Sequence, residues 1–148
     1  MPNTPALVGA GVTAVCPNAE INGEEFEALR EIIGTFSLGE QVDEKLFDAV
    51  VSVSGSSPAY VFMFIEAMAD AAVIQGMPRD KAYRFAAQAV MGSAKMLLET
   101  GKHPGELKDM VCSPGGTTIE AVAVLEEKGF RTAVIEAMRA CGEKSSKM

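Results

Sequence analysis

The feature that most constrains this chain is a strand–helix–strand pattern in its first 42 residues with no further sheet to join. Residues 11–16 form a β-branched run that Pro17 ends, and residues 35–38 can form a second strand. Between them, Asn22 is a candidate N-cap for a helix that Gly34 stops. These elements make one βαβ crossover. Because two strands alone do not make a stable sheet, the unit is expected to need more sheet than the chain supplies.

From Asp43 onward the pattern predicts helices only. Asp43 is a candidate N-cap for a helix that runs through residue 50. Ser57 is expected to cap the next helix, because Pro58 suits the first helical position. That helix should end near Gly76. Further helices are predicted over residues 79–99, where Gly101 marks the end, and over residues 105–110, 119–127 and 130–144.

The predicted helices carry more apolar surface than one small chain can cover. They are rich in Ala, Met and Val, and little of any helix reads as fully exposed. In the helix over residues 79–99, Phe85, Val90 and Leu97 are expected to point inward. For a chain of 148 residues this pattern favours burial against a second copy over an internal core alone.

Charge and hydropathy exclude two kinds of partner. The net charge is −7, and the 13 Lys and Arg residues are scattered among 20 acids, so no nucleic acid is expected to bind. The most apolar stretch, residues 59–74, is too short to span a bilayer and carries Glu66 and Asp70. No membrane partner is therefore expected.

Isolated residues with reactive side chains give little functional signal. His103 has no triad or metal partners near it in sequence, and is expected at a helix start or on the surface. Glu66 and Asp70 lie four residues apart on a helix, where carboxylates are usually solvated or paired with a cation. The three cysteines lack metal-ligand spacing, so no metal is expected, and their odd number indicates reduced thiols in a cytoplasmic protein.

The turn at residues 113–118, Ser-Pro-Gly-Gly-Thr-Thr, is better placed for binding. Two consecutive glycines let a ligand approach the backbone closely. Thr117 and Glu120 have the spacing of a capping box at the start of the next helix. The unpaired amides and positive dipole of a helix N-terminus favour a carboxylate or a phosphate. Spacing alone leaves two readings open: an anion site, or an ordinary capped helix after a tight turn.

Three motifs make the chain resemble pyrroline-5-carboxylate reductases. They lie in the family's order over residues 54–60 (Ser-Gly-Ser-Ser-Pro-Ala-Tyr), 103–109 (His-Pro-Gly-Glu-Leu-Lys-Asp) and 113–120 (Ser-Pro-Gly-Gly-Thr-Thr-Ile-Glu), with Gly-Phe-Arg at 129–131. The opening Met-Pro-Asn-Thr-Pro is similar to the family's motif at the end of its dinucleotide-binding domain. One departure is Ser57, where the family usually has glycine.

The resemblance implies a mainly α fold. Residues 43–148 would form an interlocking helical dimerisation and substrate-binding domain, like the C-terminal domains of the 6-phosphogluconate-dehydrogenase type. Residues 1–42 would be a remnant βαβ unit of a Rossmann sheet. The chain has no G-x-G-x-x-G fingerprint, so Met1 is expected to be an internal methionine of a longer protein.

The resemblance also implies chemistry: hydride transfer from NADPH or NADH to 1-pyrroline-5-carboxylate, giving L-proline. Thr118 is the expected catalytic residue, with its hydroxyl near the ring nitrogen. Asn3 and Thr4 would lie on the nicotinamide side of the cofactor. The expected substrate-binding residues, which include amides at 116–118 and the hydroxyl of residue 113, are Ser113, Gly115, Gly116, Thr117 and Thr118.

Because no glycine-rich loop is present, this chain is expected to fold and dimerise without turning over alone. A homodimer is expected, since the family completes its substrate site between two subunits. One alternative is a non-catalytic module that binds proline or takes part in subunit assembly. A related hydroxy-acid dehydrogenase is disfavoured, since it would carry a catalytic lysine motif in place of the Ser-Pro-Gly-Gly-Thr-Thr turn.

Overall fold

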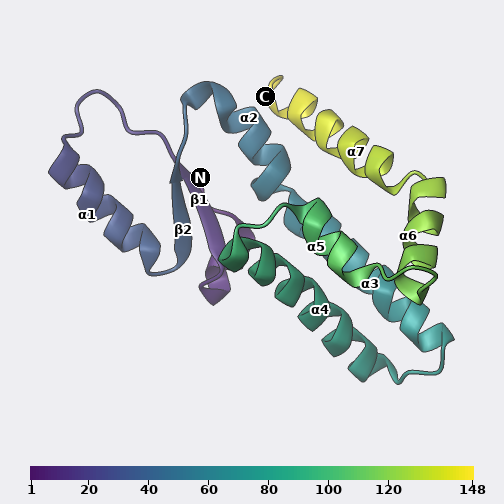
Figure 1. Cartoon of the computed structure of the whole chain (residues 1–148). Coiled ribbons are helices and arrows are strands. Elements are labelled where there is room, and N and C mark those ends of the chain that lie inside the picture. Colours follow the sequence, from purple (N-terminus) through teal and green to yellow (C-terminus); the bar gives the residue numbers. More distant parts are fainter. The chain divides into compact units, whose positions relative to one another are not determined.

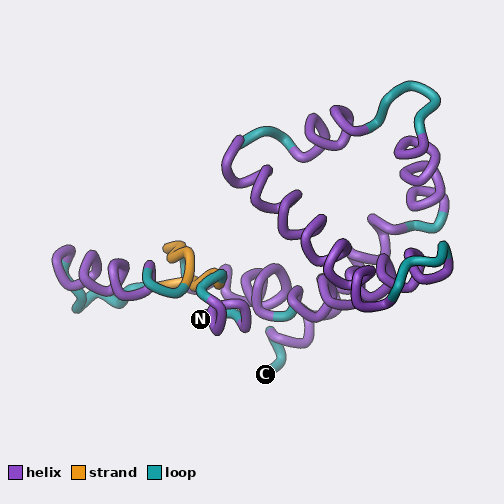
Figure 2. The backbone as a smooth tube through the Cα atoms, turned by 90° about the horizontal axis from the view of Figure 1, so that it is seen from below, coloured by secondary structure: helices purple, strands orange, loops and turns teal.

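The computed structural model describes all 148 residues, and the chain divides into two compact units. Unit 1 comprises Met1–Val61 and Ile135–Met148, and unit 2 comprises Phe62–Val134. Figure 1 labels the α-helices and strands, and Figure 2 colours the backbone by type. The elements are η1 (Thr4–Val8), β1 (Gly11–Val15), α1 (Gly23–Gly34), β2 (Ser37–Gln41), η2 (Glu44–Leu46), α2 (Phe47–Val50), η3 (Val51–Gly55), α3 (Ser57–Ile74), α4 (Arg79–Thr100), α5 (Pro104–Val111), α6 (Thr117–Glu127) and α7 (Phe130–Ser145). The mainly helical fold predicted from the sequence is confirmed.

The predicted βαβ crossover is present in unit 1. Strands β1 and β2 are parallel, with Gly11 opposite Ser37 and Val15 opposite Gln41, and α1 connects them. The prediction that the second strand begins at Thr35 is wrong. The Thr35 amide and hydroxyl both bond to the Ile32 carbonyl, at 3.2 Å and 2.7 Å, which extends the helical turn and delays the strand.

The first residues of the chain cover the second edge of β1. Pro2 and Thr13 form an antiparallel bridge. The Met1 amino group donates to the Ala14 carbonyl at 2.7 Å, and the Ala14 amide donates back to the Met1 carbonyl at 3.0 Å. Strand β1 is therefore paired on both edges, whereas no strand lies on the outer edge of β2.

Helix α1 packs on the sheet through Ile33, which is buried. A Cβ at Gly39 of β2 would lie 3.1 Å from Cγ2 of Ile33, so glycine allows this close approach. The cap predicted at Asn22 is confirmed as one half of a capping box. Asn22 Oδ1 accepts from the Glu25 amide and Glu25 Oε2 accepts from the Asn22 amide, both at 3.0 Å.

The prediction that Ser57 caps a separate helix is wrong. The chain stays helical from Glu44 to Ile74, and Val51–Gly55 forms a π-helical turn. The Ser56 amide reaches back five residues to the Val51 carbonyl at 2.8 Å. Pro58 has no amide hydrogen, and the wider turn before it lets the helix continue. The Ser57 hydroxyl donates to the Val53 carbonyl at 2.5 Å instead of capping a new helix.

This continuity removes the argument that the apolar stretch is too short to cross a membrane. The helical run Glu44–Ile74 has 31 residues and is long and apolar enough to do so by length and composition. Those two criteria are weak evidence for a span, because a core helix of a soluble protein meets them as well. A helix that packs against a second copy of the chain needs an apolar surface of the same kind.

The helix ends predicted in unit 2 are confirmed at two glycines. Gly76, at φ 93°, ends α3 in a Schellman motif, in which the Met77 amide bonds to the Ala72 carbonyl at 3.0 Å. Gly101, at φ 62°, ends α4. Both positions need the left-handed backbone that glycine adopts at low cost.

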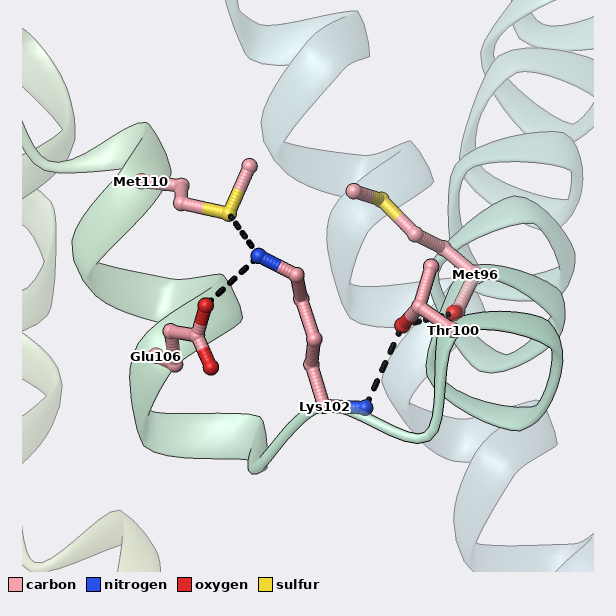
Figure 3. Close-up of polar contacts among 5 residues, drawn as sticks. All are labelled: Met96, Thr100, Lys102, Glu106 and Met110. Atoms are coloured by element: carbon pink, nitrogen blue, oxygen red, sulfur yellow. Dashed lines mark hydrogen bonds and ion pairs between the residues drawn. The ribbon is translucent and has the colours of Figure 1, made fainter.

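The link between α4 and α5 is fixed by side chains on both helices (Figure 3). The Lys102 ammonium bonds to Glu106 Oε1 at 2.6 Å and lies 4.0 Å from the Met110 sulfur, both on α5. The Lys102 amide donates to the Thr100 hydroxyl at the end of α4 at 3.4 Å. This short link sets where α5, and the turn that follows it, begin.

Unit 2 has almost no core of its own. Its only buried apolar side chains are Ala69, Ala82 and Ala86. No two helices within residues 62–134 pack closely along their backbones. The prediction that Phe85 points inward is wrong for the single chain, since 67% of Phe85 is exposed. Large apolar side chains thus remain uncovered on these helices.

Candidate functional site

The candidate site begins with a tight turn between α5 and α6. The Gly116 amide donates to the Ser113 carbonyl at 3.0 Å, which closes a four-residue turn. Pro114 occupies the second position and Gly115, at φ 66°, the third, which is the residue pattern of a type II turn. Pro-Gly at these positions therefore dictates the turn locally.

Gly116 leaves room for the Ser113 side chain. A Cβ at Gly116 would overlap the Ser113 hydroxyl oxygen and lie 3.1 Å from the Ser113 carbonyl oxygen. The absence of a side chain lets the Ser113 hydroxyl lie beside the start of α6. The two glycines thus have different functions: Gly115 allows the backbone turn, and Gly116 makes room for the Ser113 hydroxyl.

Helix α6 begins without a side-chain cap. Its N-cap is Gly116, and no side chain bonds to the amides of the first turn. The predicted capping box of Thr117 with Glu120 is wrong. Since α6 begins at Thr117, Glu120 is its fourth residue, and a capping box requires the third.

Three consecutive amides at this helix start have no acceptor within the chain. They belong to Thr117, Thr118 and Ile119, in the first turn, where an α-helix provides no carbonyl for them. The side chains of Ser113, Thr117 and Thr118 are exposed beside them. With the positive end of the 11-residue helix dipole, these groups form a site suited to a small carboxylate or phosphate.

Two cations that form ion pairs lie on α5, before the turn in sequence, and on α7, after α6. Lys108 of α5 bonds to Asp109, which raises the pKa of Lys108, and the nearby charge of Arg131 opposes this. Arg131 of α7 bonds to Glu126 at 2.6 Å, which raises its own pKa. Both side chains therefore carry positive charge that acids of the same unit already compensate.

Of the other titratable residues singled out in the sequence, His103 and Asp70 have structural roles. His103 starts α5 as predicted, and its Nδ1 accepts from the Gly105 amide at 3.1 Å. Asp70 forms an ion pair with Arg79, which raises the pKa of the Arg79 guanidinium. Glu66 takes part in no ion pair, and no group of His, Cys, Asp and Glu residues is arranged to hold a metal ion.

The two residues expected near a cofactor lie in unit 1. Asn3 is half-buried, and its side chain bonds within the chain at both ends. Its Oδ1 accepts from the Val12 amide at 2.9 Å, and its Nδ2 donates to the Ser54 carbonyl at 3.1 Å. Thr4 is exposed at the start of η1. The turn and the start of α6 lie in unit 2. The residues expected near the cofactor therefore belong to unit 1, and the residues expected to bind the substrate belong to unit 2.

Sequence reasoning did not foresee a polar cluster of Ser56, Tyr60 and Cys141 in unit 1. The Cys141 thiol donates to the Ser56 hydroxyl at 3.2 Å. Hydrogen bonding with Cys141 is also the main cause that raises the pKa of Tyr60. Cys141 lies 85 residues from Ser56 along the chain, so no local pattern could have placed the two together.

Comparison with known proteins gives consistent matches over the whole chain. Residues 44–148 match the family profile described as pyrroline-5-carboxylate reductase dimerisation. The pyrroline-5-carboxylate reductase of Escherichia coli K12 is 70% identical over 148 residues, which are 100% of this chain and 55% of that protein. The chain therefore spans about half the length of the curated relatives that it matches.

Solved structures match as well. A pyrroline-5-carboxylate reductase from Coxiella burnetii superposes with a TM-score of 0.94 at 34% identity, over 99% of this chain and 55% of that one. The pyrroline carboxylate reductase of Plasmodium falciparum, solved with NADP bound, has a TM-score of 0.89 at 35% identity, over 98% of this chain and 58% of that one. Both matches include the βαβ unit and the helices.

Proposed function

This chain belongs to the pyrroline-5-carboxylate reductase family, and from that premise we propose that it provides the substrate-binding and dimerising part of an enzyme that reduces 1-pyrroline-5-carboxylate to L-proline. The observation that supports this most directly is the start of α6. Three amides there have no acceptor, and those of Thr117 and Thr118 directly follow a turn whose glycines leave room for a ligand. A carboxylate is the part of this substrate that such a site would hold.

In the proposed mechanism, the amides of Thr117 and Thr118 and the hydroxyl of Ser113 bind the substrate carboxylate. The Gly116 amide closes the turn, while Gly115 and Gly116 let the ligand approach the backbone. The Thr118 hydroxyl lies near the ring nitrogen and orients the ring. The imine binds protonated, so no strong side-chain acid is required.

NADPH or NADH, when bound, supplies a hydride to the imine carbon, and the C=N electron pair passes to the nitrogen. Asn3 and Thr4 belong to the segment proposed to lie beside the nicotinamide. Because both ends of the Asn3 amide group are engaged within the chain, the segment would meet the cofactor through its backbone and the Thr4 hydroxyl. These 148 residues contain no glycine-rich loop for the pyrophosphate.

We propose residues 43–148 as the dimerisation and substrate-binding domain and residues 1–42 as part of a dinucleotide-binding domain. The uncovered apolar side chains of α3 and α4, among them Phe62, Met63 and Phe85, support a homodimer. The protein is proposed to act in the cytoplasm, with no nucleic-acid or membrane partner.

A second candidate function is a non-catalytic module that binds proline or takes part in subunit assembly. It is supported by the two-stranded sheet, which leaves most of a nucleotide without a binding surface among these residues. Under this alternative, L-proline binds, but no reduction depends on this chain's residues in any assembly.

A chimera with the Escherichia coli enzyme tests the proposed function. The 148 residues replace the matching part of that enzyme, and 70% identity favours correct assembly. We expect NADPH oxidation that depends on pyrroline-5-carboxylate and yields L-proline. Thr118→Val should lower kcat at least about tenfold, whereas Thr118→Ser, which keeps the hydroxyl, should lower it much less. A well-folded chimera that forms no proline would contradict the proposal and favour the module.

A further inference from the structure

Asn3 makes two hydrogen bonds that connect distant parts of unit 1. Its Oδ1 accepts from the Val12 amide of β1, nine residues along the chain. Its Nδ2 donates to the carbonyl of Ser54, 51 residues along the chain, at 3.1 Å. The two ends of one side-chain amide thus join the sheet to the π-helical turn η3.

The carbonyl that Asn3 bonds lacks its ordinary helical partner. In an α-helix, the carbonyl of residue 54 would accept from the amide of residue 58. Residue 58 is proline, which has no amide hydrogen. The Ala59 amide bonds instead to the Ser56 carbonyl, at 3.1 Å. The donor that the structure provides for Ser54 is therefore the Asn3 side chain.

The other polar groups of this turn are satisfied locally. The Ser54 hydroxyl donates to the Val50 carbonyl at 3.1 Å, and the Ser57 hydroxyl donates to the Val53 carbonyl at 2.5 Å. The Ser54 carbonyl differs because its donor comes from a remote segment. An unsatisfied, partly buried carbonyl is costly, so this bond fixes where the chain's first residues lie.

We propose that Asn3 is a structural clamp. Its amide group clamps the segment Met1–Val8 and strand β1 onto the π-helical turn, through the carbonyl that Pro58 leaves without a helical donor. The clamp sets the position of Thr4, the next residue, relative to the start of α3. The clamp itself is independent of the proposed function, whereas the cofactor contact of Thr4 rests on the proposed function.

The test is a double-mutant cycle between residues 3 and 58 in the 148-residue chain, without substrate or cofactor. Asn3→Asp keeps the acceptor for the Val12 amide but removes the donor to Ser54. Pro58→Ala restores a backbone amide that can bond to Ser54 within the helix. The control is Asn18→Asp, since the Asn18 side chain acts only as an acceptor, from the amides of Glu20 and Ile21. The measurement is urea unfolding, with amide hydrogen exchange at Val12.

Asn3→Asp is expected to raise the unfolding equilibrium constant roughly tenfold, and less than about threefold when Pro58→Ala is already present. Exchange at the Val12 amide should stay slow in Asn3→Asp and speed up in Asn3→Ala. If Asn3→Asp alone does not fold, Asn3→Asp with Pro58→Ala should fold. Equal effects of Asn3→Asp with and without Pro58→Ala, or an equal effect of Asn18→Asp, would overturn the proposal. The unfolding and exchange measurements do not depend on whether the chain takes part in proline synthesis.

Discussion

Gly116 is expected to affect the candidate binding site more than it affects the fold. A methyl group there would meet the Ser113 hydroxyl, which is the end of a rotatable side chain, and would crowd the Ser113 carbonyl less severely. Rotation of that hydroxyl away from α6 relieves most of the overlap. The fold should therefore tolerate the substitution better than the binding site does.

Gly116→Ala is expected to lower the free energy of unfolding by about 1 kcal/mol or less. It should weaken L-proline binding about tenfold, because the Ser113 hydroxyl leaves the carboxylate site. Isothermal titration calorimetry and urea unfolding measure the two effects. The matched control is Gly34→Ala, at the exposed end of α1, where a Cβ meets nothing within 4 Å. Equal L-proline affinity in Gly116→Ala and the unaltered chain would contradict this role.

At single residues, sequence reasoning succeeded where the signal was local. The N-cap at Asn22 and the glycines that end α3 and α4 have effects confined to neighbouring residues. The Thr117 cap was misassigned by one position because Gly116 and Thr117 both suit an N-cap. The bond from Asn3 to Ser54 spans 51 residues, so no local pattern indicates it.

The starts of α1 and α6 form a natural comparison between elements. The first has a capping box, and the second has free amides and no side-chain cap. Asn22→Ala should lower the free energy of unfolding by about 1 kcal/mol, because the Glu25 amide loses its acceptor on the Asn22 side chain. Thr117→Ala should change it by less than about 0.5 kcal/mol. Urea unfolding of both variants checks this, and a larger loss in Thr117→Ala would mean that Thr117 does cap α6.

The continuous helix from Glu44 to Ile74 could not have been predicted from its sequence. A serine before a proline usually marks a helix start, and Ser57 and Pro58 fit that pattern. The structure keeps the helix going by widening one turn to the π form. Whether the helix continues or restarts at Ser57 depends on a donor for the Ser54 carbonyl. That donor is the Asn3 side chain, 51 residues away along the chain.

On the scale of the whole molecule, the helices of unit 2 leave large apolar side chains uncovered. The sequence predicted more apolar surface than one chain can bury, and the exposed side chains of α3 and α4 agree with that expectation. The sequence could not indicate which apolar side chains remain uncovered, because that depends on how the helices pack. Phe85, expected inward, is exposed for this reason.

Phe85→Glu is expected to shift the chain from dimer to monomer, because a buried unpaired charge at an interface is costly. Sedimentation velocity over a range of concentrations measures the dissociation constant, which should rise at least about a hundredfold. The control is Ile32→Glu on α1, where 62% of the side chain is exposed, compared with 67% for Phe85. If both variants dimerise equally well, Phe85 is not part of the interface.

The most direct test of the whole account is a titration of the ¹⁵N-labelled chain with L-proline, followed by amide chemical shifts. We expect saturable shifts that are largest at Thr117 and Thr118, whose amides have no acceptor in the chain. Pyrrolidine, which lacks the carboxylate, should leave those amides unchanged. Equal shifts with pyrrolidine, or L-proline shifts that avoid the first turn of α6, would contradict the claim that this turn binds the substrate carboxylate.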